Sequence, residues 1–135
     1  MARLSKSDIA ELRKDLPEEV DRIAFFEGTE APGCSPLNSE KREGVYACAV
    51  CGEVLFTSKE KYESRSGWPS FWAPANDAAL ETKKDFKLIM PRTEFHCANC
   101  GAHGGHVFPD GPEPTGLRYC VNGAVLDFRP AKGED

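Results

Sequence analysis

Long apolar runs and dense basic clusters are both missing from this sequence. The longest purely apolar stretch has only a few residues, whereas a membrane-spanning helix needs about 20, so we expect no membrane span. The net charge is −5 and the pI is about 5.3. A protein that binds duplex nucleic acid normally carries a basic patch, and the scattered lysines and arginines here predict no nucleic-acid partner.

An apolar leader segment is lacking as well. Residues 1–8 read MARLSKSD and become charged instead of apolar, so we expect no secretory signal and a cytoplasmic protein. The six cysteines would then lie in a reducing compartment. There they indicate metal binding or redox chemistry instead of a disulfide scaffold.

The sequence has 135 residues, of which 40% are hydrophobic and 29% are charged. This length and composition suit one globular domain over residues 1–135. The sequence pattern of residues 1–28 predicts a helical N-terminal segment that covers the core. Ser5 and Asp8 have capping-box spacing, Pro17 ends one helix or opens the next, and Gly28 is the expected end. The apolar residues at helical spacing are Ile9, Leu12, Leu16, Val20, Ile23 and Ala24.

From Gly44 onward, short strand-like segments alternate with turn signals. The predicted strands are residues 45–49, 54–56, 86–90, 93–96, 106–108, 117–121 and 124–128. These features predict a mainly β fold of antiparallel sheets behind a short helical N-terminal cover.

Two CxxCG units predict a structural metal site. Cys48 and Cys51 form one pair, and Cys97 and Cys100 form the other. Two such turns facing each other make a tetrahedral four-sulfur cage, the usual structural Zn²⁺ site, which leaves no open position for chemistry. The alternatives are one redox CxxC beside an unrelated pair, two disulfides, or iron in the same cage.

Cys120 has no CxxC partner and lies in a segment that alternates like a strand. Arg118, Cys120 and Asn122 fall on one face of it. A cation beside a thiol lowers the pKa of the thiol and makes it reactive. Two histidines upstream, His103 and His106, favour reactivity further, because imidazole titrates near neutral pH. The alternative is a buried structural cysteine that packs as a small hydrophobe.

A loop between the predicted strands carries aromatic residues among Gly, Pro and Ser. It runs from Ser64 to Trp72 and contains Trp68. Aromatic residues in loops often face a ligand, although a plug over the edge of the sheet is the alternative.

Cys34 is the sixth cysteine, in an irregular segment punctuated by Pro32 and Gly33 that we expect to be exposed and mobile. One thiol in such a segment and one in a strand suit a resolving and an attacking thiol. The alternative is that Cys34 is a stray thiol and an external thiol acts on Cys120.

These motifs together resemble the B-type methionine-(R)-sulfoxide reductases, from residue 28 to residue 128. The resemblance rests on the paired CxxC units and on SGWPSF at residues 66–71, AHGGHVFPDGP at 102–112 and RYCVN at 118–122. It implies twisted antiparallel sheets, a structural zinc, and reduction of free or protein-bound methionine-(R)-sulfoxide by a cysteine that thioredoxin recycles.

The resemblance also implies a role for each matching residue. Cys120 is the nucleophile, Trp68 contacts the substrate methyl group, and Arg118 lies beside the thiol. The groups around the sulfoxide oxygen are His103, His106 and Asn122, and the zinc ligands are Cys48, Cys51, Cys97 and Cys100.

Three residues depart from the family pattern. Gly104 replaces a common leucine and Gly123 a common serine, which we expect to loosen the pocket wall. Ser66 replaces the resolving cysteine of many members, which removes one common recycling route.

Two other functions compete with the reductase. A zinc-stabilised binding module is the alternative that paired CxxC units suggest, but it gives Cys120 and the histidines no role. A cysteine hydrolase would use Cys120 with a histidine.

Overall fold

The computed structural model describes residues 3–26, 28–33, 35–86 and 91–131. The chain begins with two helices, α1 (Lys6–Arg13) and α2 (Glu18–Phe26). Ser5 caps α1 through the predicted capping box with Asp8. Pro17 precedes the first turn of α2, where a missing N–H costs nothing. The helical N-terminal region is therefore confirmed, with a break between the two helices.

Nine short strands follow within the described residues. They are β1 (Gly44–Cys48), β2 (Val54–Thr57), β3 (Lys61–Tyr62), β4 (Ser70–Phe71), β5 (Leu80–Asp85), β6 (Arg92–Cys97), β7 (His103–Phe108), β8 (Arg118–Val121) and β9 (Leu126–Pro130). Two 3-10 turns, η1 (Pro36–Ser39) and η2 (Gly123–Val125), complete the elements.

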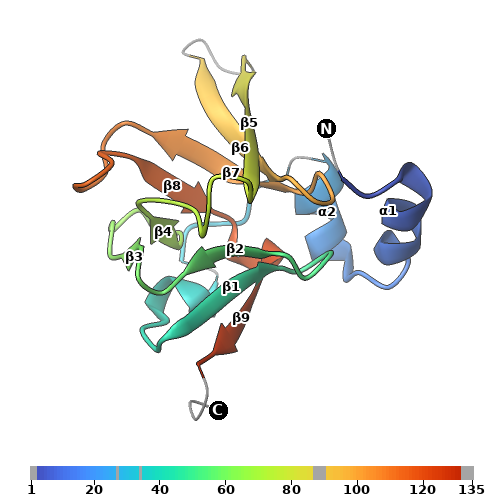
Figure 1. Ribbon diagram of the computed structural model, residues 1–135, viewed down its shortest axis with the longest axis horizontal. Helices are drawn as coiled ribbons and strands as arrows, with labels where there is room; N and C mark the ends of the chain where they lie inside the picture. Colours follow the sequence, from blue (N-terminus) through green and yellow to red (C-terminus); the bar gives the residue numbers. More distant parts are fainter. Residues whose placement is uncertain (1–2, 27, 34, 87–90, 132–135) are drawn as a thin grey trace.

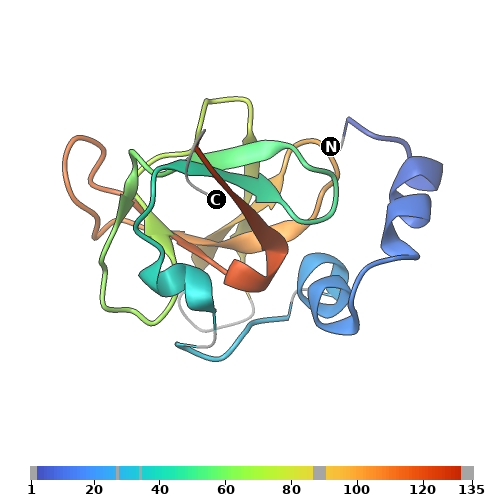
Figure 2. The same ribbon diagram turned by 90° about the horizontal axis from the view of Figure 1, so that it is seen from below.

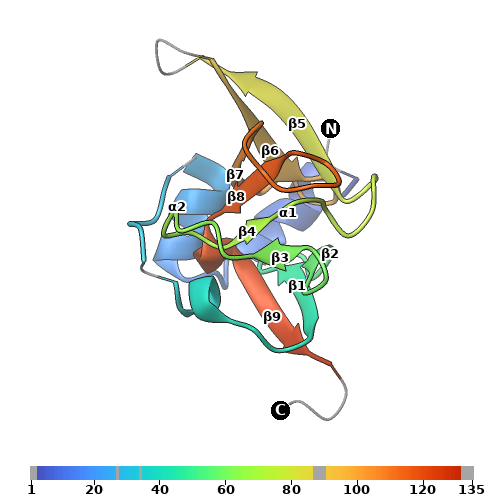
Figure 3. The ribbon, with the colours of Figure 1, turned by 90° about the vertical axis from the view of Figure 1, so that its left-hand side faces the viewer.

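The strands form two antiparallel sheets. One has three strands in the order β2-β1-β9, and the other has six in the order β3-β4-β8-β7-β6-β5. Figure 1 shows the smaller sheet below the larger one. In the view of Figure 3, β5 and β6 rise at the top while β1 and β9 lie below. The prediction of a mainly β fold of antiparallel sheets is confirmed.

An aromatic core joins the two sheets. Phe56 of β2 stacks on Phe71 of β4 with ring centroids 4.3 Å apart, and Tyr46 of β1 meets Phe71 edge-on. Phe95 of β6 approaches Phe56 from the larger sheet. All four rings are fully buried. Burial of such large side chains is the main favourable term in folding, so this core fixes one sheet against the other.

The helices lie at one side of the sheets, as Figure 2 shows. Ile23 and Ala24 of α2 are buried against β7 and η2, whereas α1 contributes no buried residue. Within the described part of the chain, no helix has the length and apolar character needed to cross a membrane.

Strands β3, β4 and β5 were not predicted, and the predicted strand 86–90 falls mostly on residues outside the described part of the chain. Residues 87–90 lie outside the described residues, and Phe86 is not in a strand. Instead β5 ends at Asp85, and four of its six residues are exposed. The segment 124–128 begins as the turn η2 before β9 starts at Leu126.

Candidate active site and metal centre

One face of the larger sheet carries the chemically active side chains. In the strand register, Cys120 of β8 lies opposite His106 of β7, and His106 lies opposite Glu94 of β6. Residues directly opposite in neighbouring strands share a face. The thiol, an imidazole and a carboxylate therefore form a row across three strands.

A β-bulge brings a second histidine to the same face. Between β6 and β7 the register passes from Phe95↔Gly105 to His96↔His103, so Gly104 is the extra residue. In a regular strand, residues three apart point to opposite faces, but a bulge changes this. The ring of His103 lies 5.5 Å from that of His106 and 5.5 Å from that of His96. The chain contains three histidines, and all three are gathered on this face.

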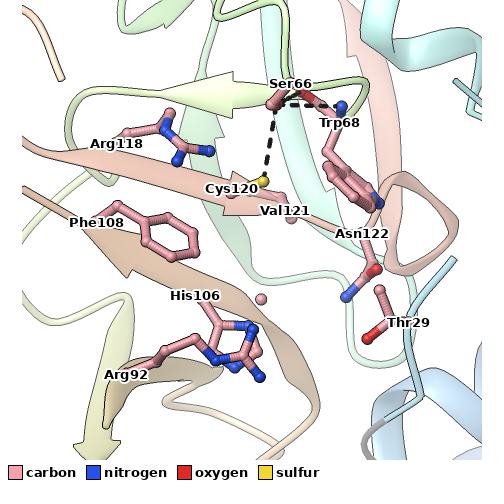
Figure 4. Close-up of a pocket in the computed structure, with 11 residues that line it drawn as sticks. Thr29, Ser66, Trp68, Arg92, His106, Phe108, Arg118, Cys120, Val121 and Asn122 are labelled. Atoms are coloured by element: carbon pink, nitrogen blue, oxygen red, sulfur yellow. Dashed lines mark hydrogen bonds between the residues drawn. The ribbon is translucent and has the colours of Figure 1, made fainter. Parts of the chain in front are cut away.

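Beside this row lies a pocket of about 260 Å³, shown in Figure 4. It brings together most of the residues predicted to form the site, namely Trp68, His106, Arg118, Cys120 and Asn122. Thr29, Ser66, Arg92 and Phe108 also line it. In Figure 4 the thiol lies between the indole of Trp68, with Asn122 next to it, and a polar wall formed by Arg118 and His106, with Phe108 between these two.

His103 does not line this pocket. Its side chain is 2% exposed, and its Nδ1 atom lies 4.0 Å from the Oε2 atom of Glu94. It packs behind His106, which does line the pocket. The sequence alone left both His103 and His106 as candidates for the acid that protonates the sulfoxide oxygen. Of the two, His106 lines the pocket, so this arrangement favours His106.

The environment of Cys120 differs from the expectation. Burial raises the pKa of the Cys120 thiol above its ordinary value and outweighs the lowering effects of Ser66 and Arg118. The Ser66 hydroxyl lies 3.9 Å from the Cys120 sulfur. The expected lowering of the pKa by Arg118 has the right sign but is too small. Burial therefore favours the thiol over the thiolate at this position.

Arg118 also has partners of its own. Its guanidinium donates two hydrogen bonds to the Asp110 carboxylate, at 2.8 and 3.1 Å, and lies 4.3 Å from the centre of the Phe108 ring. The charge that opposes Arg118 at the thiol is that of Glu30, which raises the pKa of Cys120.

One segment holds both Trp68 and Asn122 in place. The indole Nε1–H of Trp68 donates to the Glu30 carbonyl at 3.0 Å, and the Glu30 backbone N–H donates to Asn122 Oδ1 at 3.0 Å. The Asn122 amide also donates to the Gly104 carbonyl at 3.2 Å. These bonds orient the indole and the amide before any ligand enters, and such pre-organisation favours binding.

The structure accounts for both glycine departures. A Cβ atom on Gly104 would lie 2.5 Å from the Phe95 ring, and one on Gly123 would lie 2.0 Å from the Ser35 hydroxyl. The space of a larger side chain is thus already filled by Phe95 and Ser35. The expectation of a loosened pocket wall is wrong.

Cys34 lies outside the described residues. Its neighbours are described: the Gly33 N–H donates to the Gly67 carbonyl at 2.6 Å, and Ser35 is buried. The residues on either side of Cys34 thus contact the Trp68 loop and Gly123, next to the pocket.

The four CxxC cysteines form a candidate metal centre. Their sulfur atoms all lie within 4.8 Å of one another, and the Cys48–Cys100 and Cys51–Cys97 distances are 3.6 Å. A tetrahedral cage with Zn–S bonds of about 2.3 Å requires sulfurs about 3.8 Å apart. Hydrogen bonds among the four thiols, those to Cys100 first, lower the pKa of Cys51 and Cys97, while the pKa values of Cys48 and Cys100 are raised.

The backbone shapes this cage. Gly52 and Gly101 adopt positive φ angles of 85° and 81°, which glycine reaches at little cost. Their N–H groups donate back to the carbonyls of Cys48 and Cys97, closing each turn. All five described cysteines, these four and Cys120, are free thiols. The residues thus fit a metal ion and form no disulfide among themselves.

Sequence reasoning missed several residues of the site. Asp85, Arg92 and Glu94 meet beneath His106: Asp85 Oδ2 lies 2.9 Å from His106 Nε2 and 3.1 Å from Arg92 Nη2. The alternation of Arg92 and Glu94 along β6 was a usable signal. No sequence pattern indicated Asp85, because strand β5, which ends at Asp85, was not predicted.

Comparison with known proteins agrees with this geometry. A family model described as the SelR domain matches residues 16–130. The protein named peptide methionine sulfoxide reductase MsrB of Hahella chejuensis is 48% identical over 134 residues, covering 99% of this chain and 96% of the relative. The protein of the same name from Leptospira interrogans is 49% identical over 126 residues, covering 93% and 95%. The chain therefore belongs to the family of B-type peptide methionine-(R)-sulfoxide reductases.

Proposed function

We propose that this chain reduces methionine-(R)-sulfoxide, free or within proteins, to methionine, with Cys120 as the nucleophile. The observation that carries the proposal is the pocket itself. It has a thiol between an indole, with an amide beside it, and a polar wall of imidazole and guanidinium. A sulfoxide group has matching parts: a reducible sulfur, an apolar methyl group and a polar oxygen.

The first step transfers one oxygen atom. The Cys120 sulfur attacks the sulfoxide sulfur and forms a transient S–S bond. The oxygen then moves from the substrate sulfur to the cysteine sulfur, the S–O and S–S bonds of the adduct break, and methionine leaves a sulfenic acid on Cys120. The substrate sulfur gains two electrons and the cysteine sulfur loses two. The thiol proton is retained in the S–OH group, so atoms and charge balance without any further reactant.

His106 is the proposed acid in this step. Because burial favours the protonated thiol, attack requires a group that exchanges protons with the thiol and with the substrate oxygen. His106 lines the pocket opposite Cys120, and imidazole both accepts and donates protons near neutral pH. Arg118 completes the polar wall, Asn122 lies beside the indole, and His103 supports His106 from behind.

The two walls give a basis for discriminating epimers. If Trp68 contacts the methyl group while the polar wall binds the oxygen, only one of the two epimers presents its sulfur to the Cys120 thiol. The opposite epimer would place its polar oxygen against the indole and its methyl group against the polar wall, and sites built to hydrogen-bond one group reject such misplacement strongly.

Recycling needs a second thiol. We propose that Cys34 attacks the sulfenic acid, forming a Cys34–Cys120 disulfide and releasing water, and that the dithiol of thioredoxin then reduces this disulfide. Ser66 has no thiol, and the other four cysteines serve the metal cage. The segments flanking Cys34 contact the pocket loop, and a thioredoxin partner suits a reducing, cytoplasmic location.

We propose that the metal is one structural zinc ion, held by Cys48, Cys51, Cys97 and Cys100. Bound there, it supplies cross-linking and no catalysis, because a four-thiolate site has no open position. Iron in the same cage is the alternative that metal analysis distinguishes.

The recycling proposal is tested with Cys34→Ser. We expect this variant to complete a full first turnover of the R-sulfoxide and to keep activity with dithiothreitol, yet to lose most thioredoxin-driven turnover. Wild-type protein treated with substrate alone should lose two thiols and show a Cys34–Cys120 disulfide on peptide mapping. Thioredoxin-driven turnover at the wild-type rate in Cys34→Ser would refute the role of Cys34. Absence of any sulfenic acid or disulfide at Cys120 would refute the thiol mechanism.

A further inference from the structure

A buried carboxylate lies behind the pocket histidine. Asp85 is the last residue of β5, and its side chain is 2% exposed. Its Oδ2 atom lies 2.9 Å from Nε2 of His106 and 3.1 Å from Nη2 of Arg92. Both of these partners line the pocket, and Figure 4 shows them together at its lower edge. Asp85 itself does not line it.

The sheet explains how the carboxylate reaches His106. Asp85 lies opposite Arg92 of β6, and Arg92 is followed two residues later by Glu94, which lies opposite His106 of β7. All four side chains therefore belong to one face of the sheet. The Asp85 carboxylate crosses β6 diagonally and meets the imidazole one strand further on.

These contacts determine which nitrogen of His106 carries a proton. A carboxylate paired with a guanidinium is an acceptor, so the imidazole nitrogen that faces it must be the donor. The Nε2 atom of His106 therefore bears hydrogen, and in neutral imidazole Nδ1 is then the unprotonated nitrogen. Nδ1 is the nitrogen that remains for chemistry with the thiol and the substrate.

We propose that Asp85, held by Arg92, is a positioning residue that fixes His106 in the Nε2–H tautomer and in its orientation toward the pocket. This inference rests on the proposed reductase function. In the reaction, Nδ1 of His106 takes the proton of the Cys120 thiol and delivers it to the sulfoxide oxygen. The proton ends on the sulfenic acid, and His106 returns to its starting tautomer.

The neighbouring charges leave this role to Asp85. Glu94 also approaches His106, since acceptor atoms of Asp85 and Glu94 and a nitrogen of His106 lie within 4.8 Å of one another. Glu94 pairs with Lys83 at 3.3 Å and faces His96 and His103 on its other side. The short contact to His106 is made by Asp85.

The tautomer is measured directly by ¹⁵N NMR of the imidazole rings. The protein has three histidines, so its spectrum is small, and His106→Asn identifies the His106 signals by their loss. At a pH of about 9, where free imidazole is neutral, we expect wild-type His106 to carry its proton on Nε2. A wild-type spectrum with the proton on Nδ1 would overturn the proposal without any variant.

Asp85→Asn is the matching variant. Asn replaces the charged oxygen that faces both Arg92 and Nε2 of His106 with a neutral amide group, so the charge that favours a proton on Nε2 is lost. We expect the proton to move to Nδ1, and kcat for the R-sulfoxide with dithiothreitol to fall about 10- to 100-fold, part of what a general acid contributes, with KM little changed. Asp127→Asn is the control, because Asp127 is exposed and also pairs with an arginine, Arg129; it should change neither the spectrum nor kcat.

The outcomes separate this inference from the function on which it rests. An unchanged tautomer in Asp85→Asn would overturn the positioning role, even if activity fell because the protein was less stable. If Asp85→Asn does not fold, the wild-type spectrum still decides. If the wild-type protein reduced no sulfoxide and its His106 tautomer still followed Asp85, the proposed function would fail and the positioning role would stand.

Discussion

At the scale of single residues, the protonation state of Cys120 depends on the balance between burial and a few polar contacts. Burial raises the pKa of Cys120, while Ser66 and Arg118 lower it. Ser66 is itself within hydrogen-bond distance of the Ser64 hydroxyl at 2.8 Å. A thiol in this balance responds measurably to the loss of either neighbour.

The directions in which burial and Ser66 shift the pKa of Cys120 predict how its reactivity depends on pH. Because the Ser66 hydroxyl lowers the pKa of Cys120, Ser66→Ala should raise that pKa further and reduce the thiolate fraction at neutral pH. The rate of Cys120 alkylation by iodoacetamide, followed against pH, should then shift toward higher pH. Ser39→Ala, at an exposed position in η1, should leave the profile unchanged. An unshifted profile in Ser66→Ala would show that the hydroxyl does not act on the thiol.

Trp68 can be tested with two variants, because it offers both a ring and an N–H. Trp68→Phe keeps an aromatic wall but loses the hydrogen bond to Glu30, worth about 1 kcal/mol of stability. Trp68→Ala loses both and should lower kcat/KM about 10- to 200-fold, the effect of losing an apolar contact in a specific pocket. We expect Trp68→Phe to keep much more activity than Trp68→Ala at similar thermal stability. A Trp68→Ala variant that melted earlier but kept its kcat/KM would make Trp68 a core residue.

At the scale of elements, the sequence predicted best where local patterns determine the outcome. The alternation of residues 118–122 predicted β8 and the shared face of Arg118 and Cys120, and both CxxCG turns were recognised. Strand β5 was missed because residues 81–84 are exposed and carry no apolar period; it exists through pairing with β6. The bulge at Gly104 also depends on pairing between distant strands. These two features place Asp85 and His103, so the contact between Asp85 and the site was not predicted.

The bulge provides a prediction at this scale. A leucine at residue 104 would overlap Phe95, so Gly104→Leu should destabilise the fold by about 1–3 kcal/mol, as overpacking does. Urea unfolding measures this change. Phe95→Ala alone should cost about 3–5 kcal/mol, and the double variant should cost less than the sum, because the leucine fills the vacated space. Strict additivity would show that Gly104 and Phe95 do not compete for the same space.

At the scale of the whole molecule, the cysteine cage connects the two sheets. Cys48 and Cys51 close the β1–β2 hairpin of the smaller sheet, and Cys97 and Cys100 close the β6–β7 hairpin of the larger one. A metal ion held by all four would tie these hairpins together at one end of the aromatic core. Structural zinc supplies on the order of 10 kcal/mol in small domains, comparable to the stability of a whole domain.

Metal removal should therefore unfold the protein. We expect one metal ion per chain by elemental analysis, and unfolded or insoluble protein after Cys51→Ser or exhaustive chelation. Cys34→Ser is the matched control, because it removes a cysteine outside the cage and should keep both the metal and the melting temperature. A metal-free Cys51→Ser protein that kept its fold and activity would contradict the cage.

The whole account depends on the pocket acting on one sulfoxide epimer through Cys120. The most direct measurement is turnover of the separate R and S epimers of methionine sulfoxide with dithiothreitol, for the wild type and for Cys120→Ser. The account predicts that the wild type reduces the R epimer and not the S epimer, and that Cys120→Ser reduces neither. Reduction of S alone, reduction of neither epimer by the wild type, or unchanged turnover in Cys120→Ser would contradict it.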